Sequence, residues 1–304
     1  GARLEIMNPF YASMPTTIFE AMSARARATG AINLGQGFPA AQGPRDVLQA
    51  AADALFNESN QYPPMSGLPG LRAAVAAHYG AHQGLDLAPD EIIVTSGATE
   101  ALAASTLALV QPGDEVVLLQ PMYDSYLPMV RQAGGIPRLV NLQAPDWQVS
   151  DAMLAEVFNA KTALIILNTP HNPTGSMLNA QSLGVIADYC RRFDCVALCD
   201  EVWEHVVFDG TAHLPLLSYP GMRNRCVKIG SAGKIFALTG WKVGWVCACP
   251  ALSQAIARAH QFLTFTTAPN LQHAVTYGLG KPADSFTAMR ADLQRSRDRL
   301  RVAL

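Results

Sequence analysis

Short apolar runs alternate with longer segments of helical periodicity from about residue 91 onward. Strands without polar alternation are buried on both faces, which is typical of a largely parallel sheet covered by helices. The pattern therefore predicts an α/β protein with a mostly parallel sheet flanked by helices. The runs that predict its strands lie at 91–95, 115–120, 136–142, 162–168, 195–201, 227–231 and 243–248.

Helical spacing is found within this region and on both sides of it. The spacing of Ile18, Met22 and Ala26 predicts a short helix after a proline-punctuated N-terminal arm. The last segment, 284–304, has a charged amphipathic pattern, and we expect such a helix to lead into a further part of a longer protein. The other helices are expected at 44–56, 71–82, 98–110, 126–132, 252–262 and 271–279.

Composition and charge narrow the kind of partner. The formal net charge is -2 over 304 residues, of which 50% are hydrophobic, and charges of both signs are mixed along the chain. Such a chain has no electrostatic footprint for nucleic acid or for an anionic membrane. It also has no apolar run long enough to span a bilayer, and its N-terminus lacks the pattern of a signal peptide. We expect a cytoplasmic protein that acts on a small molecule, with no nucleic-acid and no membrane partner.

Cysteine and histidine spacings do not predict a metal site. The six cysteines lie mostly in apolar runs and form no C-x-x-C pair, which is typical of buried free thiols in a reducing compartment. His78 and His82 lie four apart on an expected helix and could share a face, but no third ligand is evident. The sequence therefore predicts no metal ion.

Polar residues collect at the carboxyl ends of the predicted strands, where sheets of this kind bind ligands. Ser96 to Thr99 closes one strand and opens a helix, so its free amides favour a phosphate. Asp200 ends another apolar strand, where a carboxylate is costly unless it meets a cation such as a protonated ring nitrogen. Asn172 lies in a turn with two prolines and a glycine, which can aim its amide at a ligand oxygen. Taken singly, these features also fit a plain strand-to-helix turn, an arginine-paired carboxylate and a turn without a ligand.

Lys234 stands among apolar neighbours in the segment 227–246. A desolvated ammonium loses its proton easily, and a neutral lysine amine is the nucleophile that forms a Schiff base with an aldehyde. We therefore expect a nucleophilic lysine on the same edge of the sheet as Asp200 and Asn172.

Three motifs follow one another along the chain: NTPHNPTG at 168–175, DEVWEHVVFDG at 200–210 and SAGKIFALTGWKVGW at 231–245. In this order and at these separations they resemble the signature of the class I/II aminotransferases, fold type I enzymes that use pyridoxal 5′-phosphate. LGQGFP, QY followed by GLPGLR, and PMYDSY are similar to motifs of the kynurenine, methionine and glutamine-type aminotransferases. The resemblance covers nearly the whole chain. It implies a seven-stranded sheet in a three-layer α/β/α fold, plus a small domain that is incomplete in this chain.

The resemblance also implies roles for individual residues. Lys234 would hold the cofactor aldehyde as a Schiff base and then move the substrate α-proton through a quinonoid, while Asp200 would hold the pyridinium nitrogen. These two residues are the expected catalytic groups of a homodimer with shared active sites. The other expected contacts are Asn172 with the phenolic oxygen, Tyr123 on the ring face, Ala98, Thr99, Ser231 and Lys242 with the phosphate, Tyr62 of a second subunit reaching the same phosphate, and Gly35, Gln36 and Gly37 beside the substrate carboxylate.

Two features depart from the family pattern. Many relatives have a tyrosine three residues after the aspartate, bonded to the phenolic oxygen, where this chain has Trp203. An indole N–H can donate a hydrogen bond but never accept one, so the reactivity of the cofactor would differ. The arginine that clamps the substrate carboxylate belongs to a C-terminal region that no segment here matches. We therefore expect an N-terminal arm and substrate loop at 1–39, a large cofactor domain at 40–280, and an interdomain helix at 281–304.

The expected reaction is amino-group transfer from an aromatic, methionine-like or glutamine-like α-amino acid to a 2-oxo acid. Tyr11, Phe38 and Trp203 are the expected walls of the substrate pocket. One alternative is a cysteine-conjugate β-lyase, because the same site can expel a β-leaving group. Another is a cofactor-sensing regulator with an attached DNA-binding module, for which residues 1–30 are too short to supply the helix-turn-helix segment.

Overall fold

The computed structural model describes residues 6–37 and 39–304 and divides the chain into two compact units, 1–41 and 42–304. Phe38, one expected pocket wall, lies outside the described residues. The first unit contains the helices α1 (Pro9–Ala12) and α2 (Ile18–Thr29). The helix predicted from the spacing of Ile18, Met22 and Ala26 is confirmed. The expected domain boundaries, 1–39, 40–280 and 281–304, stay predictions.

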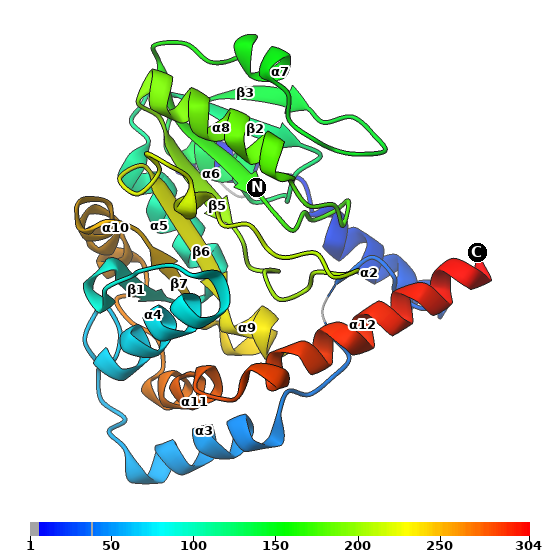
Figure 1. Cartoon of the computed structure of the whole chain (residues 1–304), viewed down its shortest axis with the longest axis vertical. Coiled ribbons are helices and arrows are strands. Elements are labelled where there is room, and N and C mark those ends of the chain that lie inside the picture. The colour runs from blue at the N-terminus through cyan, green and yellow to red at the C-terminus, as the bar shows by residue number, and fades with distance from the viewer. Residues whose placement is uncertain (1–5, 38) are drawn as a thin grey trace. The chain divides into compact units, whose positions relative to one another are not determined.

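The second unit is built on one sheet of seven strands, in the order β1-β7-β6-β5-β4-β2-β3 (Figure 1). β7 pairs antiparallel with β1 and β6, and every other neighbouring pair is parallel. The mostly parallel sheet predicted from the apolar runs is therefore confirmed. Its strands are β1 (Ile92–Thr95), β2 (Glu115–Gln120), β3 (Ile136–Asn141), β4 (Thr162–Asn168), β5 (Val196–Asp200), β6 (Cys226–Ser231) and β7 (Gly244–Cys247).

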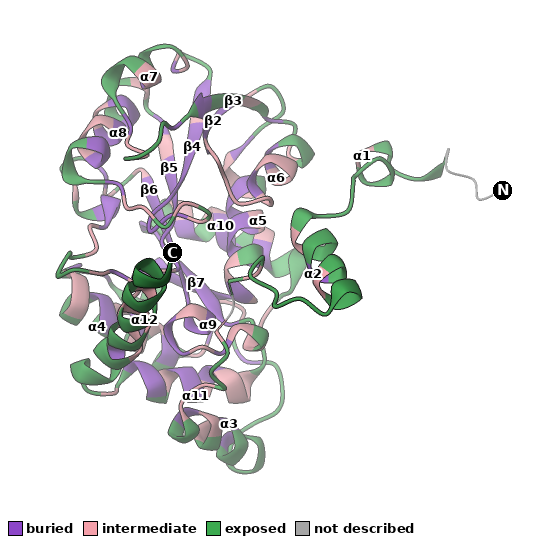
Figure 2. Ribbon diagram, turned by 90° about the vertical axis from the view of Figure 1, so that its right-hand side faces the viewer, coloured by how far each residue is buried: buried purple, intermediate pink, exposed green. Residues whose placement is uncertain are grey.

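Helices cover both faces of the sheet because successive residues of its central strands enter different cores. Along β4, Leu164 and Ile166 pack on one face, while Ile165 and Leu167 pack on the other. The first face is covered by α5 (Gly97–Leu109), α6 (Tyr126–Gln132) and α10 (Pro250–Leu263). The opposite face is covered by α4 (Pro69–Gln83), α7 (Asp151–Ala155), α8 (Ala180–Phe193) and α11 (Pro269–Leu279), with α3 (Arg45–Asn57) packed on α11. The result is the three-layer α/β/α arrangement, with its buried strands at the centre (Figure 2).

Two strands depart from the expectation of uniformly apolar, doubly buried strands. In β3 only Val140 is fully buried, and Ile136 and Leu139 are about half exposed, because β3 is the last strand of the sheet and has a neighbour on one side only. β6 contains Lys228, whose side chain has no exposed surface. Because its neighbours in the strand are apolar, the sequence pattern did not indicate that this strand contains a buried charge.

The remaining helices complete the second unit. α8 follows its N-cap Asn179, whose Oδ1 accepts a hydrogen bond from the Ser182 N–H at 2.8 Å. Its buried residues include Leu183, Ile186, Ala187 and Cys190, which recur at helical spacing, but the sequence analysis did not predict this helix. α9 (Ala232–Ile235) is one short turn after β6, and α12 (Ala283–Ala303) is the charged helix at the end of the chain. Three single turns of 3-10 helix occur at Pro89–Glu91, Leu216–Ser218 and Thr239–Trp241. Among the described residues, no helix is both long and apolar enough to cross a bilayer.

Candidate functional site

A hollow opens at the carboxyl ends of the strands and encloses about 770 Å³, its open mouth included. Register explains why residues far apart in sequence meet there: Asn168 at the end of β4 pairs with Asp200 at the end of β5. Residues of the predicted site make up most of its lining: Ala98, Thr99, Tyr123, Asn172, Asp200, Trp203, Ser231, Lys234 and Lys242. Gly97, from the expected phosphate segment Ser96 to Thr99, and Asn168, at the end of a predicted strand, line it as well. The sequence prediction did not include the other residues of the lining, Leu102, Val202, Thr239 and Val243.

One end of the hollow is the N-terminus of α5. The residue before the helix, Ser96, makes no side-chain cap to the first turn, so the amides of that turn face the hollow without a capping oxygen. Gly97 has φ +77°, and a Cβ there would lie 2.9 Å from both Cε and Nζ of Lys242. The Lys242 amine is thus packed against the first residue of the helix. A helix N-terminus beside an ammonium is a site for a dianionic phosphate.

Lys234 occupies the short helix α9, directly after β6, and lines the same hollow. Burial lowers the pKa of its ammonium, with Asp200 opposing this effect and the charge of Lys242 adding to it. Its Nζ lies 4.7 Å from the centre of the Trp203 ring, so the indole presents its face to the amine. The direction of the pKa shift makes the amine a better nucleophile near neutral pH.

Asp200 ends β5 almost completely buried. Its Oδ2 accepts a hydrogen bond from the Tyr126 hydroxyl at 2.5 Å, and its Oδ1 accepts one from the Val202 N–H at 3.5 Å. Burial raises the pKa of this carboxyl, and the Tyr126 and Val202 hydrogen bonds together with Lys234 only partly offset it. A buried carboxylate in this state gains from a further cation in the hollow.

Tyr126 is a site residue that the sequence prediction missed. It is buried at the start of α6, and its ring lies edge-on to that of Tyr123, with centroids 5.8 Å apart. The signal was present in PMYDSY, where a second tyrosine follows Tyr123 by three residues. Only the fold shows that its hydroxyl reaches Asp200 at the end of β5, which lies two strands away from β2, the strand that precedes α6.

The Asn172 turn is locked to the end of β5. The Asn168 Oδ1 accepts a hydrogen bond from the Asn172 N–H at 2.7 Å, and the Asn168 Nδ2 donates one to the Asp200 carbonyl at 2.9 Å. The His171 ring is fixed as well, since its Nε2 lies 2.8 Å from the Pro121 carbonyl oxygen. These hydrogen bonds tie the turn to the ends of two strands, and Asn172 lines the hollow.

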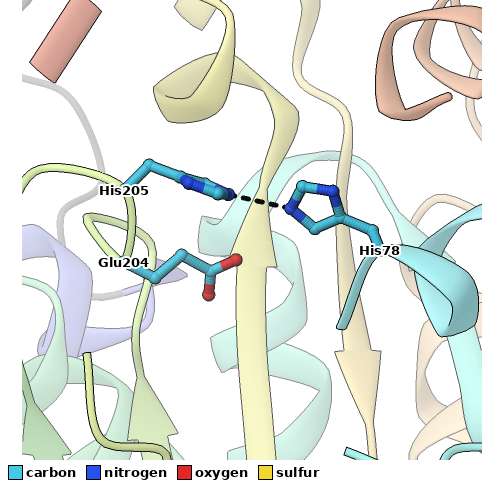
Figure 3. A group of neighbouring side chains, drawn as sticks. All are labelled: His78, Glu204 and His205. Atoms are coloured by element: carbon cyan, nitrogen blue, oxygen red, sulfur yellow. Dashed lines mark hydrogen bonds between the residues drawn. The ribbon is translucent and has the colours of Figure 1, made fainter. Parts of the chain in front are cut away.

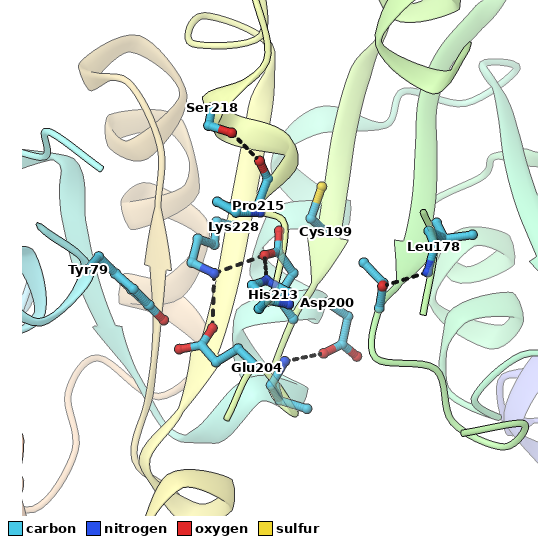
Figure 4. A network of polar contacts seen from close by, with 12 residues as sticks. Tyr79, Leu178, Cys199, Asp200, Glu204, His213, Pro215, Ser218 and Lys228 are labelled. Carbon is cyan, nitrogen blue, oxygen red and sulfur yellow. Dashed lines mark hydrogen bonds and ion pairs between the residues drawn. The ribbon is translucent and has the colours of Figure 1, made fainter. Parts of the chain in front are cut away.

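A buried ion network supports the segment that carries Asp200 and Trp203 (Figure 4). The Lys228 amine contacts Glu201 Oε1 at 3.0 Å and Glu204 Oε2 at 2.9 Å, and His213 shares Glu201 Oε1. Burial opposes the charge of Lys228, but Glu201 and Glu204 outweigh it and raise the pKa of the ammonium. The segment after β5 is thus anchored to β6 on the side away from the hollow.

Four predicted residues are not brought to the hollow within the second unit. Tyr62 is 84% exposed, and its ring lies edge-on to Phe265 at 5.5 Å instead of lining the hollow. Gly35, Gln36 and Gly37 belong to the first unit, so their place beside a substrate carboxylate stays a prediction. The same applies to Tyr11 as a pocket wall.

The fold and the hollow together define an α/β protein in which Lys234, whose pKa burial lowers, and the N-terminus of α5 beside Lys242 line one hollow at the carboxyl edge of the sheet. The sequence profile described as "Aminotransferase class I and II" matches residues 29–304. The chain belongs to the class I and II aminotransferase family, whose members are enzymes that use pyridoxal 5′-phosphate. The predicted family and the fold type I architecture are therefore confirmed.

Individual relatives agree with the profile. The chain is 44% identical to a probable N-succinyldiaminopimelate aminotransferase, DapC, of Mycobacterium tuberculosis, over 95% of this chain and 74% of that protein. It is 39% identical to a methionine aminotransferase of Escherichia coli, over 95% of this chain and 75% of that protein. A solved structure of N-succinyldiaminopimelate aminotransferase from M. tuberculosis superposes with a TM-score of 0.94 at 42% identity, and covers 97% of this chain and 78% of that one.

Proposed function

We propose that this chain binds pyridoxal 5′-phosphate in the hollow and transfers the amino group of an α-amino acid to a 2-oxo acid. The observation that carries the proposal is the placement of Lys234 and Asp200 in one hollow whose other end is the uncapped N-terminus of α5 beside Lys242. These groups match three parts of the cofactor, namely its aldehyde, its ring nitrogen and its phosphate.

The donor set supports a role for each residue. Lys242, Ser231 and the amides of Ala98 and Thr99 would hold the phosphate, and Asp200 would hold the protonated ring nitrogen. Asn172 would donate to the phenolic oxygen, and Tyr123 would cover one face of the ring. When bound, the cofactor supplies an aldehyde for the substrate amine and a ring that withdraws electrons from the substrate α-carbon.

Lys234 would then act as the base. Once the substrate amine has displaced it, its neutral amine would take the proton from the substrate α-carbon and return it to the carbon on the other side of the substrate nitrogen. Burial lowers the pKa of Lys234, so the neutral form is available at lower pH than for an exposed lysine. Asp200, held by Tyr126, would keep the ring nitrogen protonated and so maintain its electron demand.

Many relatives have a tyrosine at the position of Trp203, and its hydroxyl bonds to the phenolic oxygen of the cofactor. In this chain the face of the Trp203 indole would occupy that place. Its face lies against the Lys234 amine, and a cation over an aromatic face is stabilised by about 0.5–2 kcal/mol. With Leu102 and Val202 it gives the hollow apolar walls, which favours a donor with a sizeable uncharged or aromatic side chain. Two relatives named for methionine and for N-succinyldiaminopimelate support a long side chain.

Tyr62 would reach the phosphate of a second copy in a homodimer. It is highly exposed and lies edge-on to the partly exposed Phe265, and Phe262, three residues before Phe265, is exposed as well. Exposed aromatic residues on one surface favour association. Mixing Lys234→Ala with Tyr62→Ala subunits should restore about one quarter of the sites, since half of the dimers are mixed and half of their sites intact. No recovery of activity on mixing would argue against shared sites.

The spectrum of the protein with bound cofactor tests the proposal directly. Amino acids added one at a time should bleach the visible absorption of the lysine-bound cofactor, and methionine and phenylalanine should act faster than aspartate. A 2-oxo acid should restore it. Lys234→Ala should lack the absorption and the transfer activity, and a coloured, active variant would overturn the proposal.

A further inference from the structure

We propose that His78, His205 and Glu204 bind one zinc-type divalent transition-metal ion beside β6 (Figure 3). One nitrogen of each histidine and one oxygen of the glutamate lie within 4.8 Å of one another. His78 is on α4, and Glu204 and His205 are in the segment after β5. The fold therefore brings to His78 two ligands from a distant segment, whereas His82, its neighbour on the same helix, is not one of the three.

The contacts of these side chains leave ligand atoms free. The Nε2 atoms of His78 and His205 lie 2.8 Å apart, so only one of them donates. Among the described residues, the buried Oε1 of Glu204 has no hydrogen-bond partner, so it is open to an ion that the two Nε2 atoms would share in place of their hydrogen bond. Buried polar atoms without partners are costly, and a bound ion is one way in which proteins satisfy them.

The protonation state of the histidines suits a metal. Burial lowers the pKa of His78 to about 2, helped by His205, His82 and Lys228, and lowers the pKa of His205 to about 3. Both rings are therefore neutral at physiological pH, which is the form that binds metal ions.

The charge and geometry of the cluster also fit a dication. Glu201, Glu204 and Lys228 together carry one excess negative charge next to the two rings. Two imidazoles and one carboxylate form a ligand set of open zinc sites, in which a fourth position takes water. Tetrahedral zinc about 2.0–2.1 Å from each nitrogen would place the two nitrogens about 3.3 Å apart, so the rings need to separate by only about 0.5 Å.

The surroundings provide a closed wall and an entrance. Phe286 of α12 packs its ring 4.9 Å from the His78 ring and 5.3 Å from the His205 ring. His82 is half-buried at the edge of the cluster, with its ring centre 4.3 Å from that of His78. An ion would enter past His82 and join α4 to the segment that carries Trp203.

Metal titration of the full chain with its cofactor bound tests the proposal. After treatment with a chelator, the wild type should bind one Zn²⁺ by calorimetry, and its thermal midpoint should rise. Even outer-shell changes at metal sites weaken binding by about 10–100-fold, so His78→Gln, His205→Gln and Glu204→Gln should each weaken it by more than about 100-fold. His273→Gln is the control, because His273 is on α11 and pairs with Glu58 at 3.8 Å.

Co²⁺ gives a readout that does not depend on the folding of a variant. In the Co²⁺-loaded wild type, proton NMR should show two shifted imidazole N–H signals, one for each histidine ligand. The chain also has six buried free cysteines, which could bind the same ions. Thiolate-to-cobalt absorption, an absence of binding, or binding retained in both His78→Gln and His205→Gln would each overturn the proposal.

Discussion

Tyr126 both fixes the position of the Asp200 carboxyl and lowers its pKa. Its hydroxyl donates to Oδ2 at 2.5 Å, and this bond lowers the pKa of a carboxyl that burial raises. The charged form of Asp200 is thus favoured by a neighbour that does not line the hollow. Only the carboxylate form can stabilise a protonated ring nitrogen.

Tyr126→Phe should therefore weaken catalysis through Asp200. A hydrogen bond to a charged group contributes about 1.5–3 kcal/mol, so kcat should fall by about 10- to 100-fold. Losing the bond raises the pKa of Asp200, so activity should be lost at a higher pH than in the wild type as the pH is lowered. The pH profile of the amino-acid half-reaction measures both effects. Tyr189→Phe is the control, since that hydroxyl donates to the Asp151 carbonyl outside the hollow.

Gly97 controls the space in which Lys242 meets the helix N-terminus. An alanine there would place its Cβ 2.9 Å from the Lys242 amine, in a backbone conformation with φ +77°. Gly97→Ala should weaken cofactor binding by about 10- to 100-fold, the effect of displacing one charge-assisted bond. Equilibrium titration with pyridoxal phosphate measures it.

Gly113→Ala is the matched control for this prediction. Gly113 has φ +91°, and a Cβ there meets nothing within 4 Å. Both variants should lose about 1–2 kcal/mol of stability to backbone strain, but only Gly97→Ala should lose cofactor affinity. Equal affinities in the two variants would contradict the role given to Lys242.

At the scale of elements, β6 shows where sequence patterns succeed and where they stop. Its apolar run predicted a buried strand, and the strand is buried at every position. The same run hid Lys228, whose partners Glu201 and Glu204 come from a different strand end and its following segment. Spacing along one strand contains no information on charges that another segment brings to it.

Lys228→Met should destabilise the protein strongly. Removing one partner of a buried ion pair leaves an uncompensated charge, which costs about 3–5 kcal/mol, and here two carboxylates lose their cation. Because the pKa of Lys228 is raised above its ordinary 10.5, the stabilisation is fully present below that pH and is lost only as the pH rises further. Urea denaturation at pH 7 measures the loss. Lys281→Met, at a partly exposed pair with Asp46, should cost less than about 1 kcal/mol.

β3 and α8 mark the limits of the predicted architecture. The run at 136–142 gave the correct strand, but its exposure depends on its place at the edge of the sheet, which strand periodicity does not specify. α8 lies between two predicted strands and was not predicted, although Leu183, Ile186, Ala187 and Cys190 recur at helical spacing. Strand number and class were thus predictable from local pattern, whereas sheet order was not.

At the scale of the whole molecule, the site was predicted better than its supports. Lys234, Asp200 and Asn172 were singled out because strand ends of a parallel sheet converge, and they line one hollow. Tyr126 and the cluster of His78, Glu204 and His205 were not predicted, because each depends on contacts between elements distant in sequence. Residues that line the hollow could be predicted from their positions at the ends of strands. The residues that support them could not, because their roles depend on how distant elements pack together.

The lysine that holds the cofactor is the central claim, and the whole chain offers five candidates. They are Lys161, Lys228, Lys234, Lys242 and Lys281. Borohydride reduction after incubation with pyridoxal phosphate fixes the cofactor to the lysine that holds its aldehyde, and peptide mass spectrometry then locates it. We predict one label per chain, on Lys234. A label on Lys242, or one spread over the exposed lysines with Lys234 unmodified, would contradict the account.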